Sequence, residues 1–226
     1  MDAEILRYGE HALLVDCGSR ELTAALYAEL LRRRSEMALP VVDDLVPAER
    51  SVLIDGLDDP VGFAAELASW EVRADTAGER AAPGSGPEPS PGSESESDIV
   101  EIAVVYNGPD LAFVAEAWGV AAQSVGAVHS GYEYRSAFCG FAPGFAYLTG
   151  LPEQYHLPRR STPRPSVRPG SVAVAGPYTG VYPSSSPGGW HLIGTTDAPL
   201  WDLTRPQPAL LPPGARVRFV PREAGE

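Results

Sequence analysis

The stretch GSVAVAGPYTGVYPSSSPGGWHLIG, residues 170–194, decides the fold class. Short β-prone pieces, Ser171 to Ala175, Val181-Tyr182 and Trp190 to Ile193, alternate here with glycine, proline and serine. The wider segment from Gly140 to Gly194 holds nine glycines and nine prolines, and no part of it has helical spacing. Many short strands separated by Gly/Pro turns are typical of a β-barrel.

The segments on either side extend this reading to residues 99–226. Ile99 to Tyr106 predicts a strand, and the alternating Arg216 to Pro221 predicts another close to the C-terminus. Pro109-Asp110 is expected to open a helix that runs to Trp118, and a second helix is expected over Ala121 to His129. We therefore expect a mostly-β barrel domain over residues 99–226.

Residues 1–73 alternate strand and helix patterns in the order β-β-α-β-β-α, which predicts a small α+β domain. Ser19 can cap the first helix, and Asp59-Pro60 can open the second. The expected strands cover Glu4 to Tyr8, Ala12 to Asp16, Val41 to Val46 and Ser51 to Ile54. Between the two domains, residues 74–98 contain no Val, Ile, Leu, Phe, Tyr or Trp, and we interpret them as a disordered acidic Gly/Pro/Ser linker.

The charge is unevenly placed. Residues 1–98 hold 8 Arg against 21 Asp and Glu, whereas residues 99–226 hold 9 Arg against 9 Asp and Glu, for a net charge of −13. Nucleic-acid binding is disfavoured because phosphate backbones require a basic face. All 17 basic residues are Arg, which excludes a Schiff-base or P-loop lysine. An anion held by a cationic side chain must therefore be held by Arg or His.

Other classes are also disfavoured. The sequence contains no run of about 18 apolar residues, so no membrane span is predicted. The opening MDAEILRYGE lacks the apolar segment that a signal peptide would have. Cys17 and Cys139 are too few for a disulfide scaffold or a four-cysteine zinc site, and we expect a cytoplasmic protein with reduced thiols. The histidines lack metal-binding spacing, so we predict no metal site in this chain.

Three segments could carry chemistry. The first, GFAPGFAYLTG at 140–150, sets Phe141, Phe145 and Tyr147 among glycines, and it suits either a ligand wall with exposed backbone N–H groups or a tight β-corner. The second, 159–172, holds Arg159, Arg160, Arg164 and Arg168 with no acid, and it suits either an anion site or a solvated loop. In the third, 184–196, hydroxyls and glycines precede a Trp-His pair, and a Ser-His-Asp triad is disfavoured because no G-x-S-x-G motif occurs.

These segments, taken in order, resemble one family. The runs GFAPGFAYLTGLP, LPRRSTPRPSVRPGSVAVAG, TGVYPSSSPGGWHLIGTT and PGARVRFVP are similar to the KipI family, also called allophanate hydrolase subunit 1 or the B subunit of 5-oxoprolinase. RYGEHALLVDCG and VVDDLVPAERSVLID are similar to that family's opening segments. The resemblance covers nearly all of the chain except residues 74–98.

The resemblance implies an α+β domain followed by a cyclophilin-like β-barrel. It also implies one component of an ATP-dependent 5-oxoprolinase, which converts 5-oxo-L-proline to L-glutamate and also requires a KipA-like partner (the C subunit) and a third protein (the A subunit). Two alternatives stay open: a biotin-dependent carboxyltransferase of the urea carboxylase type, and a non-catalytic inhibitor of a histidine kinase. Three features depart from the family pattern: Thr195 replaces a common Arg, Tyr178 replaces an amide, and the loop at Val105 to Pro109 is short.

The resemblance, applied to the three segments, implies which residues form the site. Arg164 and Arg168 would hold an anionic group, and His129 or His191 would transfer a proton near neutral pH. Glycine N–H groups would bind polar atoms, and aromatic rings would wall a flat small-molecule amide substrate. The catalytic candidates are Arg164, His129 and His191, and the substrate-binding candidates are Gly140, Phe141, Pro143, Gly144, Phe145, Tyr147, Arg168, Tyr182, Ser186, Pro187, Gly188, Gly189 and Trp190.

Overall fold

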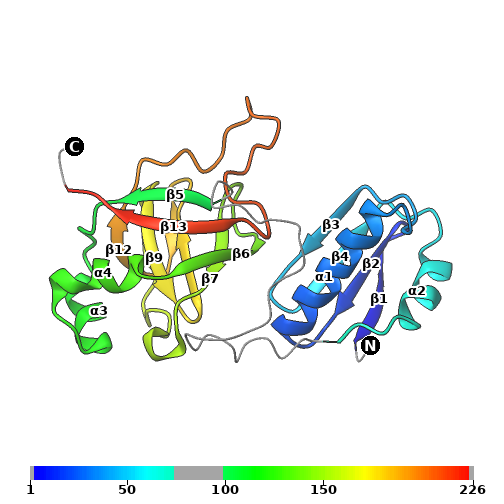
Figure 1. The fold of residues 1–226 in the computed structure, drawn as a ribbon, viewed down its shortest axis with the longest axis horizontal. Coiled ribbons are helices and arrows are strands. Elements are labelled where there is room, and N and C mark those ends of the chain that lie inside the picture. Colours follow the sequence, from blue (N-terminus) through cyan, green and yellow to red (C-terminus); the bar gives the residue numbers. More distant parts are fainter. Residues whose placement is uncertain (1–2, 74–98, 224–226) are drawn as a thin grey trace, which may run out of the picture. The chain divides into compact units, whose positions relative to one another are not determined.

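The computed structural model describes residues 3–73 and 99–223, which belong to two compact units (Figure 1). The linker predicted over residues 74–98 lies outside the described residues. Each unit has its own hydrophobic core, and each is described separately below.

The first unit has the expected β-β-α-β-β-α order, and its four antiparallel strands lie in the order β1-β2-β4-β3. The third strand begins at Asp44, three residues later than the expected Val41. The elements are β1 (Glu4–Tyr8), β2 (Ala12–Asp16), α1 (Arg20–Ser35), β3 (Asp44–Pro47), β4 (Ser51–Asp55) and α2 (Pro60–Ala68).

Both helices of this unit begin at the predicted caps. Ser19 Oγ accepts the Leu22 N–H at 3.2 Å, and Asp59 Oδ1 accepts the Gly62 N–H at 2.9 Å. Leucines of α1, Phe63 and Leu67 of α2, and alternate residues of β2 and β4 form one buried cluster. Because alternate strand residues share a face, both helices cover the same face of the sheet.

The second unit contains a seven-stranded mixed sheet in the order β12-β9-β10-β7-β6-β13-β5, and the isolated bridge between Val105 and Thr195 joins its two ends. The sheet is thereby nearly closed, which confirms the barrel predicted from sequence. Strand β13 pairs antiparallel with β6 and parallel with β5. The barrel strands are β5 (Ile99–Val104), β6 (Glu133–Cys139), β7 (Ala146–Thr149), β9 (Ser171–Ala175), β10 (Tyr178–Val181), β12 (His191–Thr195) and β13 (Arg216–Pro221).

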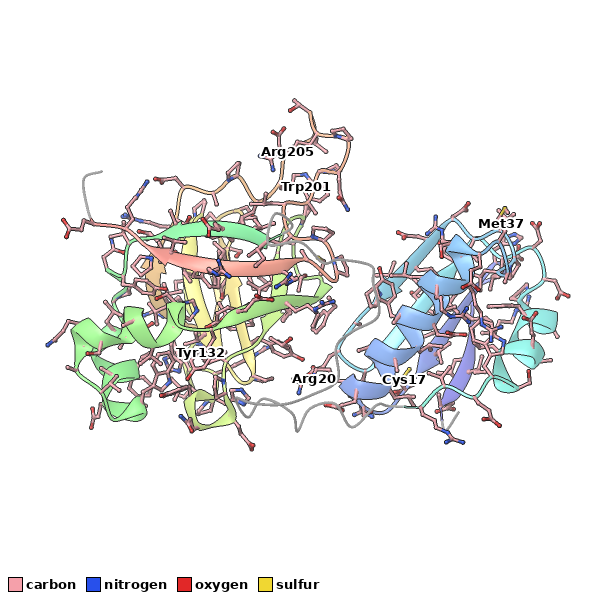
Figure 2. The ribbon with its side chains drawn as sticks, in the orientation of Figure 1. Cys17, Arg20, Met37, Tyr132, Trp201 and Arg205 are labelled. Atoms are coloured by element: carbon pink, nitrogen blue, oxygen red, sulfur yellow. The ribbon has the colours of Figure 1, made fainter. Side chains whose placement is uncertain are left out.

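Two further features lie outside the seven strands. A separate two-stranded ribbon joins β8 (Arg164–Val167) to β11 (Ser186–Gly188). The segment between β12 and β13 extends beyond the barrel, and Figure 2 shows Trp201 and Arg205 on it.

The chain segment that connects β5 to β6 is helical and packs against the barrel. Helix α3 (Leu111–Trp118) begins after Asp110 as expected, but the second expected helix is divided into a 3₁₀ turn, η3 (Ala122–Ser124), and α4 (Val125–Ser130). Within the described residues, no single helix is long and apolar enough to cross a membrane. Helix α3 and the helical segment after it reach that length only together, across an 89° bend.

Strand β9 separates two apolar clusters. Val172 and Val174 belong to the main core, with residues of β5, β13, α3 and α4. Ala173 and Ala175 belong to a second, aromatic cluster on the opposite face. This alternation places the aromatic cluster on the face of the barrel wall that turns away from the main core.

Candidate functional site

The β8–β11 ribbon covers the aromatic cluster. Val167 of β8 is buried in that cluster and pairs with Ser186 of β11, while Arg164 pairs with Gly188 across a shift in register. A Cβ atom on Gly188 would overlap the Tyr182 hydroxyl oxygen and lie 2.9 Å from a Val167 methyl. The ribbon can approach the barrel wall this closely only because glycine stands at that position.

The structure brings the five predicted aromatic residues together. Phe145 is the centre, with ring-centroid distances of 5.1 Å to Tyr147, 5.3 Å to Tyr182 and 5.5 Å to Trp190, all edge to face. Phe141 lies 5.4 Å from Phe145. Edge-to-face packing of this kind stabilises a rigid platform.

Their exposure differs from the expectation of a ligand wall. Phe145, Tyr182 and Trp190 are 2%, 2% and 5% exposed, so their rings pack inside the cluster. Phe141 is 61% exposed, and Tyr147 is half-buried. A ligand would therefore meet Phe141 and the edge of Tyr147, with the other three rings supporting them.

The glycine loop at 140–144 has a strained and closely packed backbone. Phe141 has a φ of 70°, a region that non-glycine residues rarely adopt. A Cβ atom on Gly144 would lie 2.9 Å from Trp201 Cβ and 3.0 Å from the Leu200 carbonyl oxygen. Within the loop, the N–H of Ala142 donates to Gly140 O and the N–H of Gly140 donates to Phe145 O. Part of the expected backbone N–H array is therefore used by the loop itself, and Pro143 is exposed on it.

The arginine segment has a partner that its own sequence does not contain. Arg160 Nη1 and Arg164 Nη2 both donate to Asp110 Oδ1, at 2.9 and 2.8 Å, and the Leu192 N–H donates to Asp110 Oδ2 at 2.7 Å. The Asp110 side chain is 7% exposed, against 32% for Arg160 and 22% for Arg164. Segment 159–172 itself contains no acid, and the carboxylate that offsets its arginines comes from Asp110 at the start of α3.

Asp110 is therefore held as a carboxylate. Burial opposes its charge, but the hydrogen bonds from Arg164 and the Leu192 N–H, with the charges of Arg164 and Arg160, lower its pKa overall. The guanidinium groups of Arg160 and Arg164 share the one carboxylate of Asp110, so the three side chains together carry one net positive charge.

Other candidates lie around the ribbon. Arg168, Pro187 and Gly189 are on or beside it, and Arg168 is exposed with no ion pair among the described residues. The Gly189 carbonyl accepts the backbone N–H of Arg160 at 2.8 Å. Burial raises the pKa of Tyr182, while the charges of Arg159 and Arg164 oppose that rise.

His191 and His129 occupy very different places. His191 is 4% exposed, stacks on Phe113 at 4.7 Å, and its Nε2 lies 2.9 Å from the Pro158 carbonyl oxygen. A carbonyl only accepts, so Nε2 carries the proton. His191 Nδ1 is buried and has no hydrogen-bond partner in the described residues.

His129 is 0% exposed and belongs to a network in the main core. Its Nδ1 lies 2.8 Å from the Tyr106 hydroxyl and its Nε2 lies 3.1 Å from Thr179 Oγ1. Burial lowers its pKa from the ordinary 6.5 to about 3. The proton-transfer role near neutral pH expected of His129 does not fit this environment, since the ring stays neutral and out of reach of solvent.

The departures from the family pattern also have defined positions. Thr195 is exposed at the end of β12, where its hydroxyl donates to Asn107 Oδ1 at 3.1 Å. Tyr178 is buried in the aromatic cluster. Within residues 3–73 and 99–223, no three His, Cys, Asp or Glu side chains gather as a metal ion would require.

Comparison with known proteins places this architecture. Residues 3–211 match the family described as carboxyltransferase domain, subdomain C and D. The chain belongs to that family.

Two curated bacterial proteins are similar in sequence to somewhat more than half of this chain. The 5-oxoprolinase B subunit of Escherichia coli O157:H7 is 52% identical over 141 residues, which cover 61% of this chain and 65% of that protein. The 5-oxoprolinase B subunit of Haemophilus influenzae is 44% identical over 131 residues, 57% of this chain and 62% of that protein. The matched part thus spans somewhat less than two thirds of each relative. The crystal structure of the protein TTHA0988 aligns with a TM-score of 0.69 at 33% identity, over 95% of this chain and 40% of that one.

Proposed function

We propose that this chain is the B subunit of an ATP-dependent 5-oxoprolinase, which hydrolyses 5-oxo-L-proline to L-glutamate. The observation that carries the proposal is the arginine pair beside an aromatic platform, in a chain whose named relatives are 5-oxoprolinase B subunits. A small ring that bears a carboxylate needs these two surfaces, one cationic and one flat and apolar.

The proposed roles follow the positions of the side chains. Arg164, whose side chain is 22% exposed, binds the carboxylate, and the exposed Arg168 adds positive charge beside it. Phe141 and Tyr147 line the ring, with Phe145, Tyr182 and Trp190 behind them. The backbone N–H groups of Gly144, Gly188 and Gly189 and the Ser186 hydroxyl bind polar atoms of the substrate.

His191 is the proposed proton-transfer residue. Its Nδ1 is an acceptor without a partner among the described residues, whereas both nitrogens of His129 are used in the core. When the lactam C–N bond breaks, the leaving nitrogen must gain a proton and the attacking water must lose one. An imidazole is suited to such transfers near neutral pH. Activation of the lactam carbonyl by ATP depends chiefly on positioning of the reacting groups.

The partner proteins and the nucleotide belong to the same proposal. A KipA-like chain, the C subunit, completes the site; the A subunit joins them, and ATP binds largely on or with these partners. The chain has no lysine and no recognised nucleotide loop, so it is poorly equipped to cradle a triphosphate alone. A cytoplasmic location accords with this activity and stays a prediction.

The test is reconstitution. This chain is co-expressed with the adjacent KipA-like chain and the third 5-oxoprolinase protein, and 5-oxoproline-dependent release of ADP and glutamate is measured. Release that requires every chain supports the proposal, and Arg164→Ala is expected to abolish it. Arg218→Ala is the matched control and is expected to retain this release. Arg218 is a half-buried arginine of β13 whose Nη1 lies 3.6 Å from Glu101 Oε1.

A second function is favoured by the description of the family itself. The match is to a carboxyltransferase domain, so a biotin-dependent carboxyltransferase is the competing reading. A stable complex that carboxylates an amide from a biotinyl carrier, and releases no glutamate from 5-oxoproline, would replace the proposal. Failure of any complex to form would favour the inhibitor reading.

A further inference from the structure

The inference concerns the region where the arginine segment meets the start of α3, and it rests on the function proposed above. Arg160 is one of four arginines in the segment 159–172, and the sequence pattern assigns it no individual role. In the structure it meets Arg164 on a single carboxylate oxygen, Asp110 Oδ1. Asp110 Oδ2 is taken by the Leu192 N–H, so both oxygens of this carboxylate have donors.

Unpaired buried atoms point to a missing partner in the same region. Among the described residues, four buried side-chain polar atoms lack a hydrogen bond, and three of them are Arg160 Nε, Ser186 Oγ and His191 Nδ1. Two hydrogen bonds join the segments that carry these atoms. The backbone N–H of Arg160 donates to Gly189 O, and the His191 side chain donates through Nε2–H to the Pro158 carbonyl oxygen. Buried polar atoms are seldom left unpaired in proteins, because each costs its full desolvation.

The charges of Arg160, Arg164 and Asp110 indicate which kind of group could bind here. Two guanidinium groups face one carboxylate, so one positive charge in the pair is not neutralised. Both arginine side chains are partly exposed, whereas Asp110 is almost fully covered. Solvent therefore reaches part of each arginine side chain, whereas the carboxylate is almost fully covered by its donors. A second carboxylate, from a ligand, is the group that fits.

We propose that Arg160 and Arg164 together bind the substrate carboxylate, and that Asp110 is the positioning residue that holds the two guanidinium groups side by side. The single uncompensated charge selects a monocarboxylate over its uncharged carboxamide. Recognition of the acid group is thus assigned to this pair, and Asp110 acts only through it.

The experiment measures selectivity as well as activity. The reconstituted complex is assayed with 5-oxoproline and with 5-oxoprolinamide, in which a neutral carboxamide replaces the carboxylate. Arg160→Gln should lower kcat/KM for the acid roughly 10- to 100-fold, as expected for a lost hydrogen bond to a charged group. The value for the carboxamide should change less than about threefold, since it has no charge to lose.

Two more variants separate positioning from folding. Asp110→Asn keeps an acceptor for the Leu192 N–H but removes the charge, and it should reduce the acid-to-amide ratio mainly through KM. Arg160→Lys, which keeps the charge without the fork, should fall between wild type and Arg160→Gln. Arg218→Gln is the control and should leave the ratio unchanged. Thermal unfolding of each purified chain reports whether the variant is folded.

The outcomes distinguish this inference from the proposed function. An unchanged acid-to-amide ratio in folded Arg160→Gln would overturn the inference while leaving the 5-oxoprolinase reading intact. If the wild-type complex hydrolyses neither compound, the ratio is measured by calorimetric binding of the same two compounds to the full chain. Equal binding of the two to the wild-type chain, or no binding of either, would overturn the inference.

Discussion

Lowering the pH should destabilise the barrel unit through one side chain, His129. Its ring is 0% exposed and its pKa falls from 6.5 to about 3 in the folded protein. Between these values the unfolded chain takes up a proton that the folded chain does not. Protonation therefore favours unfolding, and stability is lost as the pH falls.

The magnitude follows from the size of that pKa difference. A group that titrates only in the unfolded state costs about 1.4 kcal/mol for each pH unit below its unfolded pKa. From about pH 7.5 to about pH 5, the free energy of unfolding should fall by about 2 kcal/mol on account of His129 alone. This is a large part of the stability of an ordinary domain.

The assay is urea unfolding at several pH values, followed by tryptophan fluorescence, since Trp118, Trp190 and Trp201 belong to the barrel unit. The comparison variant is His129→Gln, whose amide can still bond to Tyr106 and Thr179 but has no proton to gain. The other histidines and all carboxylates are common to both proteins, so the difference between the two pH profiles isolates His129. Parallel profiles would refute the argument, because they would mean that the buried ring does not resist protonation.

Three further changes test other parts of the structure. Ser19→Ala should lower the unfolding free energy of the first unit by about 1 kcal/mol by removing the cap of α1, as measured by urea unfolding; an unchanged midpoint would contradict the cap. Gly180→Ala should lower the Tm of the barrel unit, because the new Cβ atom would lie 3.0 Å from the Trp190 ring, and an unaltered Trp emission and Tm would count against that packing. Phe141→Ala should raise the KM for 5-oxoproline by removing the exposed ring from the platform, and a KM equal to that of wild type would show that Phe141 is not part of the site.

Local sequence signals predicted many elements closely. The strands at Glu4–Tyr8, Ser171–Ala175 and Arg216–Pro221 have the predicted bounds, because alternation and turn residues mark both of their ends. Strands β8 and β11 gave no such signal. Their sequences, RPSV and SPG, have low strand propensity, and they form through pairing with each other over the barrel wall.

The sequence predicts which aromatic and arginine residues gather, but it does not predict how they are arranged or which of them are exposed. The aromatic residues do gather, but the sequence could not show that the ribbon would bury Tyr182 and Trp190 and leave Phe141 exposed. The sequence alone indicates Asp110 only as part of a helix start, Pro109-Asp110. Its guanidinium partners lie 50 and 54 residues further along the chain, and no local pattern reports a pairing over that distance.

The position of β13 has a consequence for synthesis of the protein. This last strand inserts between β5 and β6, the first and second strands of the barrel unit, and pairs with both (Figure 1). In a nascent chain that lacks β13, the facing edges of β5 and β6 have no partner strand. Such unpaired edges promote aggregation and chaperone binding. The first unit has no such dependence, because its sheet is complete within residues 3–73. During synthesis the first unit can thus complete its sheet while the barrel still lacks β13.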